Sequence, residues 1–384
     1  MIAPTPFFAH RGCSVRVYEE ARALVQLGND VVICTYHLGD DVPGLSVYRT
    51  ANVPWYNRLG AGPSYHKLYL DVLLWFKSLR VALRVKPDVI HGHLHEGTAL
   101  GYVVGRTLNI PLLSDVQGSL TGELKAHGFV RGEGLYYRLL LRLERAVDAM
   151  PHVSVASSGP VADDLRQRFG ARNVFLARDG VDEDVFTPSV PKASLRETLP
   201  ADVKIVVYLG LLSDYQGIDC LLEAIPQVLQ GNDKVHFLLM GYPNVDEYRE
   251  KARSLSLGKY VTFTGRIPYS EAPSYLNLGD LAVAPKMAET ESNGKLFNYM
   301  ACGLPIVAFD TPVNREILGD LGLYARLGDC SSLASVLLGA INDDGLLTDL
   351  GTKLRKRAVT LFTWENTARQ LVDCYDLALG QRGQ

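Results

Sequence analysis

Apolar runs rich in β-branched residues alternate with segments of helical spacing along the whole chain. In the first half, helical spacing is clear over residues 15–28 and 66–85, and the apolar runs between such segments predict strands. The predicted strands of this half are MIAP, DVVICTY, LSVYRT, PDVIHGH, IPLLSDV, HVSVAS and NVFLA. This alternation indicates an α/β fold with a mostly parallel sheet covered by helices.

The second half repeats the pattern after a polar, proline-containing stretch at residues 182–201, which predicts a linker. Its predicted strands are KIVVYLG, VHFLLMG, YVTFTG, DLAVAP and LPIVAF. The helix predicted after the first of them has apolar residues at three- and four-residue steps, with an expected kink at Pro226. Two doubly wound domains in tandem place ligand sites at the carboxyl ends of their strands.

Composition agrees with this picture. The chain has 384 residues, more than one hydrophobic core usually supports. Its formal net charge of −3 argues against a nucleic-acid-binding protein, which is normally basic. The six cysteines are scattered without a CxxC pair, so the sequence predicts neither a zinc site nor a disulfide framework and fits a reduced setting. Neither a membrane-spanning helix nor a signal peptide is expected.

The richest candidate site is residues 289–309, a loop and helix between two predicted strands. Ser292 and Gly294 are small enough to let backbone amides approach a ligand, and the helix is expected to begin near Lys295. A helix N-terminus suits a diphosphate, and the lysine adds a positive charge. Candidate partners for sugar hydroxyls in this stretch are Glu289, Glu291 and Asn298. An ordinary capped turn from loop to helix is an equally good interpretation of the pattern alone.

A second strand, loop and helix lie at residues 207–225. The strand ends at Gly210, and Ser213, Asp214 and Gln216 lead into the helix. This again places a polar loop and a helix N-terminus at the expected ligand edge. The signal is weak by itself, since glycine in such a turn is often only a steric requirement.

His91, His93 and His95 alternate at the end of a predicted strand and could share one face. A metal site would need a further acidic or histidine partner, and none is suitably spaced elsewhere in the sequence. The strand is expected to end at the ligand site. A role for His93 and His95 in lining the cleft is therefore favoured over a metal site and over a purely structural role.

The predicted helix at residues 134–150 carries Arg138, Arg142 and Arg145 on one stripe, together with tyrosines and leucines. Such a stripe could contact an anionic membrane surface. The alternative, which the pattern favours, is a core helix whose arginines reach solvent along their apolar stems.

Five motifs occur in order along the chain. They are DGVDEDVFTP (residues 179–188), GLLSDYQGIDCLLEAI (210–225), FTGRIPYSEAPSYLNLGDLAVAP (263–285), YMACGLPIVAF (299–309) and FTWENTARQLVDCYDLAL (362–379). Together they resemble the motifs of family 4 glycosyltransferases of the GT-B fold, and the resemblance runs nearly end to end.

The resemblance implies two Rossmann-like domains facing each other across a cleft, at residues 1–182 and 183–362, with a helix at 363–384 that returns to the first domain. It implies transfer of a sugar from a nucleoside diphosphate sugar to an acceptor hydroxyl with retention of anomeric configuration, without a metal or another cofactor. The donor would lie mainly against the second domain and the acceptor against the first.

The implied partners are a nucleotide-sugar donor and a sugar, lipid-linked or small-molecule acceptor, and no nucleic acid. The implied setting is the biosynthesis of polysaccharides, glycolipids or other glycoconjugates. A protein of this kind is expected in the cytoplasm, with peripheral contact at the inner face of a membrane as a further expectation.

Several positions depart from the family pattern. The arginine and lysine that normally neutralise the donor diphosphate fall on Leu211 and Gln216. Lys295 is the nearest candidate substitute, with Arg266 and Arg11 as others. The paired glutamates of the family fall on Thr290 and Asn298. Glu289 or Glu291 would take the first role, and the asparagine can still bind a ribose hydroxyl as a neutral partner.

In the first domain, Gln117 stands where the family often has a histidine, and His127 follows downstream. The glycine-rich loop is reduced to HRGCS, in which Gly12 matches one family glycine. The candidate catalytic residues are Glu289, Glu291, Lys295 and His127. The candidate donor-binding residues are Gly12, Gly210, Gln216, Gly265, Arg266, Ser292, Asn293, Gly294 and Asn298. The candidate acceptor-side residues are Gln117, His93 and His95.

Two other functions are compatible with the sequence. A nucleotide-sugar epimerase of the same fold would need acidic catalytic groups from both domains and leaves the motifs at 179–188 and 362–379 unexplained. A non-catalytic protein that binds sugar nucleotides would explain the missing arginine and lysine. Because the loops keep polar residues suited to a ligand, a divergent transferase is favoured.

Overall fold

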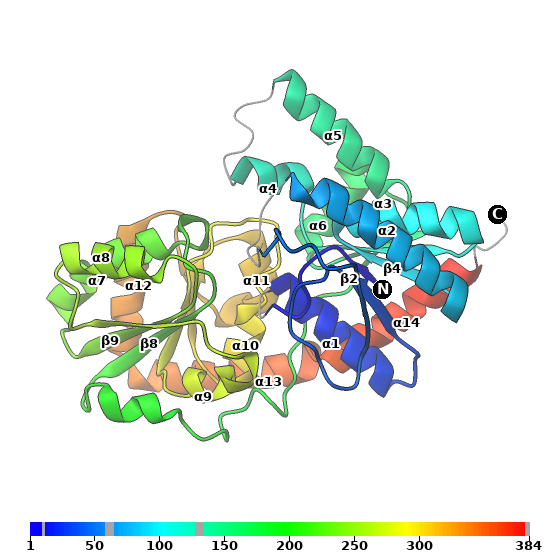
Figure 1. The fold of residues 1–384 in the computed structure, drawn as a ribbon. Helices are drawn as coiled ribbons and strands as arrows, with labels where there is room; N and C mark the ends of the chain where they lie inside the picture. Colours follow the sequence, from blue (N-terminus) through cyan, green and yellow to red (C-terminus); the bar gives the residue numbers. More distant parts are fainter. Residues whose placement is uncertain (10–11, 58–64, 127–133, 381–384) are drawn as a thin grey trace. The chain divides into compact units, whose positions relative to one another are not determined.

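The computed structural model describes residues 1–9, 12–57, 65–126 and 134–380. The chain forms two compact units (Figure 1): the first holds Met1–Asp179, Thr290–Ser292 and Trp364–Gln384, and the second holds Gly180–Glu289 and Asn293–Thr363. Each unit has its own parallel sheet covered by helices. The predicted fold class, two Rossmann-like α/β domains, is therefore confirmed.

The sheet of the first unit has seven parallel strands in the order β3-β2-β1-β4-β5-β6-β7. Most of these strands are short, apolar and buried, as expected for a parallel sheet with both faces covered. Their bounds are β1 Ile2–Ala3, β2 Val32–Thr35, β3 Ser46–Arg49, β4 Ile90–His93, β5 Leu112–Val116, β6 Val153–Ala156 and β7 Val174–Leu176.

The helices of this unit form two groups. Helices α2 and α5 both pack against α3, whereas α1 and α14 pack against each other and α14 also covers β5 and β6. The C-terminal helix thus returns to the first unit, as predicted. The bounds are α1 Gly12–Gln26, α2 His66–Val85, α3 Leu94–Leu108, α4 Leu120–Ala126, α5 Leu135–Asp148, α6 Gly159–Asp164, the π-helix η1 Leu165–Phe169 and α14 Trp364–Gly380.

The sheet of the second unit has six parallel strands in the order β10-β9-β8-β11-β12-β13. Two apolar clusters, one on each side of this sheet, form the core of the unit. The strand bounds are β8 Lys204–Leu209, β9 Val235–Met240, β10 Val261–Gly265, β11 Leu281–Ala284, β12 Ile306–Phe309 and β13 Leu323–Ala325.

Three helices of the second unit begin at a capping side chain. The side chains of Thr311, Asp329 and Asp343 each accept a hydrogen bond from a backbone amide in the first turn, which satisfies groups that have no partner within the helix. The bounds are η2 Ser194–Thr198, η3 Asp214–Gln216, α7 Ile218–Gly231, α8 Val245–Ser254, η4 Tyr269–Glu271, α9 Ala272–Leu276, α10 Lys295–Ala301, α11 Pro312–Leu318, η5 Gly319–Leu321, α12 Cys330–Ile341 and α13 Asp344–Leu361.

Every strand predicted from the apolar pattern is present, and the helix predicted at residues 66–85 has those bounds. Strand β13 was not predicted, because it has three residues and no long apolar run. Pro226 lies inside α7, which continues past it. The stretch predicted as a linker is attached to the second unit, where Asn277 Nδ2 donates to the carbonyl oxygens of Thr187 and Val190.

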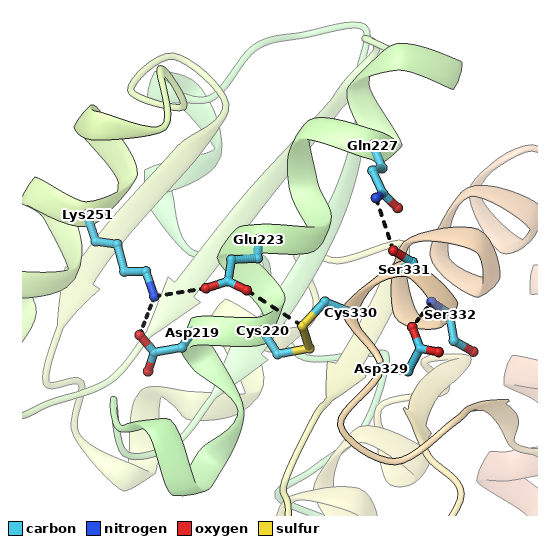
Figure 2. The surroundings of a disulfide bond; sticks show 9 residues. All are labelled: Asp219, Cys220, Glu223, Gln227, Lys251, Asp329, Cys330, Ser331 and Ser332. Atoms are coloured by element: carbon cyan, nitrogen blue, oxygen red, sulfur yellow. Dashed lines mark hydrogen bonds and ion pairs between the residues drawn. A yellow bond between two sulfur atoms is a disulfide. The ribbon is translucent and has the colours of Figure 1, made fainter.

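The prediction from cysteine spacing was wrong for one pair. Cys220 in the first turn of α7 and Cys330 at the start of α12 form a disulfide (Figure 2), with 5.1 Å between their Cα atoms. The two helices pack against each other, and the residues lie 110 positions apart. Sequence spacing cannot show such a pair, because only the packing of α7 on α12 brings the sulfur atoms together.

Each described helix is too short or too polar to cross a membrane.

We expect the variant Cys330→Ser to lower the free energy of unfolding by about 2–4 kcal/mol, because the disulfide closes a long loop in the unfolded chain. Chemical denaturation without reductant measures this loss. In the presence of dithiothreitol, the unchanged protein and the variant should have nearly equal stability. The double variant Cys220→Ser with Cys330→Ser should lose little more than the single one, and full additivity would contradict the disulfide.

Candidate active site

A lysine of the second unit lies against the carboxyl end of β8. The strand ends at Leu209, and Gly210 follows with φ of 154°. A Cβ atom on Gly210 would lie 2.8 Å from Lys295 Nζ. Glycine at this position therefore leaves the space that the ammonium group occupies.

Lys295 is the first residue of α10. Its Nζ donates to Gln216 Oε1 at 2.8 Å and to the hydroxyl oxygen of Tyr208 at 3.1 Å, and lies 4.3 Å from the centroid of the Tyr208 ring. Burial lowers the pKa of this ammonium group, and the positive charge of Lys286 lowers it further. Two neighbouring lysines in a desolvated place favour a bound anion, since an anion would relieve both effects.

The loop between β8 and α7 is packed tightly against the end of β11. Gly217 has φ of 75°, and a Cβ atom there would overlap the carbonyl oxygen of Pro285. The backbone amide of Met287 also donates to the carbonyl oxygen of Tyr215 at 3.1 Å. These contacts fix Gln216 in the turn just before α7, and the N-terminal end of a helix favours negative charge.

Two further predicted donor-binding residues lie at the carboxyl end of β10. Gly265 ends this strand with φ of 76°, and its carbonyl oxygen accepts from the amide of Gly241 at 3.0 Å. The guanidinium carbon of Arg266 lies 5.5 Å from the centroid of the Tyr242 ring. Arg266 thus directly follows the carboxyl end of β10, and β10 is the neighbour of β9 in the sheet.

The other predicted donor-binding residues lie at α10. Gly294 precedes the helix, and Asn298 is partly buried within it. Asn293 is buried; its Nδ2 donates to Asn314 Oδ1 at 3.1 Å, and its Oδ1 has no hydrogen-bond partner within the described residues. Because α10 has only seven residues, we expect the charge of Lys295 to contribute more to the binding of an anion than the N-terminus of this helix does.

The first unit has a buried ionic network centred on Arg16 of α1. Its Nε and Nη2 atoms donate to the carboxylate of Asp115 at 2.8–3.2 Å, and its Nη1 donates to Asp179 at 2.8 Å. Glu20 lies one helical turn along α1, 2.9 Å from Arg16 Nη2. Burial alone would raise the pKa of Asp115, but the Arg16 guanidinium holds it well below its usual range.

Asp115 is the last residue but one of β5 and orients two of the predicted acceptor-side residues. Its Oδ2 accepts from His93 Nδ1 at 3.0 Å and from Gln117 Nε2 at 2.9 Å. Burial lowers the pKa of His93, so that this imidazole is neutral with its proton on Nδ1. Because the amide nitrogen of Gln117 donates to Asp115, the amide oxygen of Gln117 can accept a hydrogen bond from another group.

Residues 290–292 belong to the first unit, although they lie in the loop before α10. Ser158 Oγ donates to the carbonyl oxygen of Thr290 at 2.6 Å, and Ser292 Oγ donates to Asp179 Oδ2. A Cβ atom on Gly118 would lie 2.8 Å from Glu291 Cγ. The structure therefore brings Glu291 next to the residue that follows Gln117, whereas Lys295, a few positions later, belongs to the second unit.

His95 lies in a different cluster, between α3 and α5. Its Nε2 is 3.4 Å from Asp148 Oδ1 and 3.8 Å from Glu144 Oε1, and Thr121 donates to Glu144 through its amide and its hydroxyl. Burial opposes the charge on His95, but the carboxylate of Asp148 raises the pKa of His95 to about 9. His95 is thus an imidazolium that holds α5 to α3.

Acidic partners for the three histidines do exist, contrary to the expectation from sequence spacing. Two groups have ligand atoms within 4.8 Å of one another: Glu20, His91, His93 and Asp115, and His95, Glu144 and Asp148. In the first group Arg16 already pairs with both carboxylates, and in the second the charge of His95 compensates the carboxylates.

Four predicted residues remain to be placed. Glu289 is exposed, in the loop between β11 and α10. Gly12 is the first residue of α1, and a Cβ atom there would meet nothing within 4 Å. His127 and Arg11 lie outside the described residues.

Models of known protein families match most of the chain. The model described as Glycosyltransferase Family 4 matches residues 10–185, and the model described as Glycosyl transferases group 1 matches residues 203–343. The chain belongs to glycosyltransferase family 4.

Proteins named as glycosyltransferases are similar over most of the chain. The phosphatidyl-myo-inositol mannosyltransferase of Mycolicibacterium smegmatis is 24% identical over 390 residues, covering 99% of this chain and 94% of that protein. The D-inositol 3-phosphate glycosyltransferase 1 of Catenulispora acidiphila is 26% identical, covering 77% of this chain and 74% of that protein.

Solved structures share the GT-B fold. Sucrose-phosphate synthase from Thermosynechococcus elongatus superposes with a TM-score of 0.82 at 20% identity, covering 98% of this chain and 96% of that one. HepE of Anabaena, in complex with UDP and glucose, has a TM-score of 0.76 at 16% identity and covers 98% of this chain and 99% of its own.

The missing family cations have a structural counterpart in this glycosyltransferase. Gln216 stands where the family has a lysine, and its Oε1 accepts a hydrogen bond from Lys295 Nζ. An ammonium group therefore lies beside residue 216 here as well. It belongs to a residue of α10 and not to residue 216 itself. Leu211 supplies no charge, and its carbonyl oxygen accepts from the Tyr208 hydroxyl at 2.7 Å.

Four charged residues of the site were not predicted from the sequence: Arg16, Glu20, Asp115 and Asp179. A signal was present, because the first two occupy apolar-facing positions of α1 and Asp115 follows three apolar or small residues in β5. Charged residues in such positions are rarely buried unless paired. Their pairing itself depends on contacts across up to 163 positions, which spacing does not show.

We expect His95→Gln to destabilise the enzyme most at low pH. The pKa of His95 rises from 6.5 to about 9 on folding, so its contribution, about 3 kcal/mol, is fully present below pH 6.5 and is lost as the pH rises through 9. Urea denaturation of both proteins between pH 6 and pH 10 should give unfolding free energies that converge at the alkaline end. A difference that does not change with pH would contradict a charged His95.

Proposed function

We propose that this enzyme transfers a sugar from a nucleoside diphosphate sugar to an acceptor hydroxyl, with retention of anomeric configuration and without a metal. The observation that carries the proposal is the Lys295 ammonium at Gln216, against the end of β8. A diphosphate there would receive positive charge from Lys295 and Lys286 and backbone amides from the N-terminus of α7.

The donor class is supported by the relatives in the structural comparison. HepE of Anabaena has been solved in complex with UDP-glucose, and its chain covers 98% of this one. A leaving nucleoside diphosphate gains negative charge as its bond to the sugar breaks. Fixed positive groups that are already desolvated stabilise that charge more in the transition state than in the ground state.

The acceptor is proposed to be polar and hydroxylated, in glycolipid or other glycoconjugate biosynthesis. Gln117 presents its amide oxygen, fixed by Asp115, and Glu291 lies beside Gly118; both can accept a hydrogen bond from a hydroxyl. Glu289 remains a candidate for a sugar hydroxyl. Relatives named for phosphatidyl-myo-inositol and inositol phosphate support an inositol- or lipid-linked acceptor, used in the cytoplasm or at a membrane surface.

The proposed donor site can be tested by removing the positive charge at residue 295 and then restoring it at residue 216. Lys295→Met should weaken binding of the preferred nucleoside diphosphate about 10- to 100-fold, as loss of a charge-assisted hydrogen bond costs about 1.5–3 kcal/mol. The double variant Lys295→Met with Gln216→Lys, which returns the cation to its family position, should recover much of the affinity. Isothermal titration calorimetry of UDP, GDP and ADP measures both effects and identifies the base.

Lys234→Met is the matched control, because Lys234 is an exposed lysine of the same unit; its affinity for the nucleotide should be unchanged. If Lys295→Met and Lys234→Met bind the nucleotide equally well, Lys295 is not part of the donor site. Binding of nucleotide without hydrolysis or transfer of the sugar by the unchanged protein would favour a non-catalytic sugar-nucleotide-binding protein.

The proposed retention of anomeric configuration can be tested on the product of the reaction. Proton NMR should show that the new glycosidic bond has the same anomeric configuration as the donor, with the corresponding coupling constant at the anomeric proton. An inverted product would contradict the proposed stereochemistry and leave the donor site itself intact.

A further inference from the structure

The disulfide of the second unit lies close to the proposed donor site along the chain. Cys220 is the third residue of α7 and comes four positions after Gln216, whose Oε1 accepts from Lys295 Nζ. Its partner Cys330 is the first residue of α12. The disulfide therefore ties the first turn of α7, and with it the turn that holds Gln216, to a second helix (Figure 2).

Other contacts join α7 and α12 further along the two helices. Gln227 Nε2 donates to Ser331 Oγ at 3.1 Å (Figure 2), and Asn232 Nδ2, just after α7, donates to Asn342 Oδ1 at 2.8 Å. Apolar side chains of both helices also belong to one core cluster. We therefore expect the two helices to stay packed when the disulfide is opened, while the first turn of α7 gains freedom.

The first turn of α7 also has an anchor on α8. Asp219, next to Cys220, accepts from the Tyr248 hydroxyl at 2.8 Å and from Lys251 Nζ at 2.5 Å. Opening the disulfide would remove the tie of this turn to α12 and leave its tie to α8. Reduction should therefore make the turn more mobile without unfolding it, which is what a reversible regulatory change requires.

The two sulfur atoms of the disulfide differ in accessibility and in their charged neighbours. Cys220 is buried, and Cys330 is partly exposed. Cys330 Sγ also lies 3.9 Å from the Glu223 carboxylate, which disfavours negative charge on that sulfur (Figure 2). A thiolate from solution therefore attacks Cys330 Sγ, and Cys220 is the sulfur that leaves with the negative charge.

The position of Cys220 favours its role as leaving group. It lies in the first turn of α7, where the N-terminus of the helix stabilises the negative charge of a thiolate. A stabilised leaving thiolate makes thiol–disulfide exchange faster. By contrast, burial raises the pKa of the free thiols of Cys302 and Cys374 to about 12 and about 11, so these two cysteines do not exchange readily.

We propose that the disulfide between Cys220 and Cys330 is a site of thiol–disulfide exchange that regulates nucleotide binding, and that the oxidised protein binds the nucleotide more tightly. One thiolate of a dithiol reductant attacks Cys330 Sγ, the bond between the two cysteines breaks, and Cys220 leaves and takes up a proton. The second thiol of the reductant then displaces Cys330 from the mixed disulfide. In total, two electrons and two protons pass from the dithiol to the two cysteines, and the reductant becomes a disulfide.

Regulation of this kind rests on the proposed function, because the regulated quantity is the affinity of the donor site at Lys295 and Gln216. In the reduced protein, the first turn of α7 would have to be ordered again when the nucleotide binds, and such ordering weakens binding. The proposed function also places the enzyme in the cytoplasm or at a membrane surface. Disulfides in a reducing compartment are usually transient and redox-sensing.

The experiment compares the oxidised protein with the protein reduced by dithiothreitol. Hydrogen–deuterium exchange without nucleotide should show a loss of protection in the first turn of α7 on reduction, while β9 stays protected. Isothermal titration calorimetry with UDP, GDP and ADP should show that the affinity for the preferred nucleotide falls about three- to tenfold. Reoxidation with glutathione disulfide should restore both the protection and the affinity.

Cys330→Ser cannot form the disulfide, and it should bind the nucleotide as the reduced protein does, with or without dithiothreitol. Cys374→Ser is the matched control, because Cys374 is a free cysteine of α14; this variant should respond to dithiothreitol as the unchanged protein does. Treatment with glutathione, a monothiol, should place the mixed disulfide on Cys330, which mass spectrometry of peptides detects.

Unchanged affinity on reduction, in a protein that binds the nucleotide, overturns the proposal, as does an affinity of Cys330→Ser that still changes with dithiothreitol. A mixed disulfide on Cys220 contradicts the order of attack. Loss of protection on reduction, in a protein that binds no nucleotide in either state, supports the exchange site and overturns the proposed function, so the two failures are distinguishable. The melting temperature of each form shows that it is folded.

Discussion

The first unit depends on a buried guanidinium group. Arg16 is enclosed in the protein and would cost several kcal/mol if its charge were unpaired. Asp115 and Asp179 compensate it, while burial and the neighbouring charge of Asp115 raise the pKa of Glu20, the third carboxyl group of the cluster. The pairing fixes helix α1, the end of β5 and the last residue before the chain enters the second unit. Gln117, which contacts the acceptor in the proposed function, and Ser292, a predicted donor-binding residue, are each hydrogen-bonded to a carboxylate of this network.

The buried cation of the second unit has neutral partners, whereas that of the first unit is paired with carboxylates. Lys295 has neutral hydrogen-bond partners, Gln216 and Tyr208, and both burial and Lys286 make its charge less favourable. A balanced network such as that of Arg16 holds a structure in place, whereas an uncompensated cation favours the arrival of an anion. The two units thus contribute different groups to the proposed reaction. Fixed polar groups of the first unit orient the acceptor, and the excess positive charge of the second unit stabilises the leaving diphosphate.

Apolar periodicity was sufficient for the fold, because burial on both faces of a parallel sheet leaves a strong signal in most strands. Strand β13 was not predicted, because its three residues are not part of a long apolar run. The site was only partly predictable. Lys295, Gln216 and Gly210 were identified from the turns in which they lie, and the structure brings them together. His95 was assigned to the acceptor side, but its contacts are with α5. Pairs such as Arg16 with Asp179 or Cys220 with Cys330 depend on packing between elements far apart in sequence, which local patterns do not encode.

The lysine also bears on how family motifs are applied to divergent members. A comparison position by position finds glutamine in place of the phosphate-binding lysine and suggests that the donor site is lost. In space, however, the amide oxygen of Gln216 holds the ammonium group of another residue at 2.8 Å, and Gly210 leaves room for it. Because an electrostatic site requires a charge at a point and not a particular backbone position, the loss of one motif residue indicates loss of function only when no other side chain can reach that point. Here Lys295 reaches it from α10, and the sequence alone gave both residues without showing their contact.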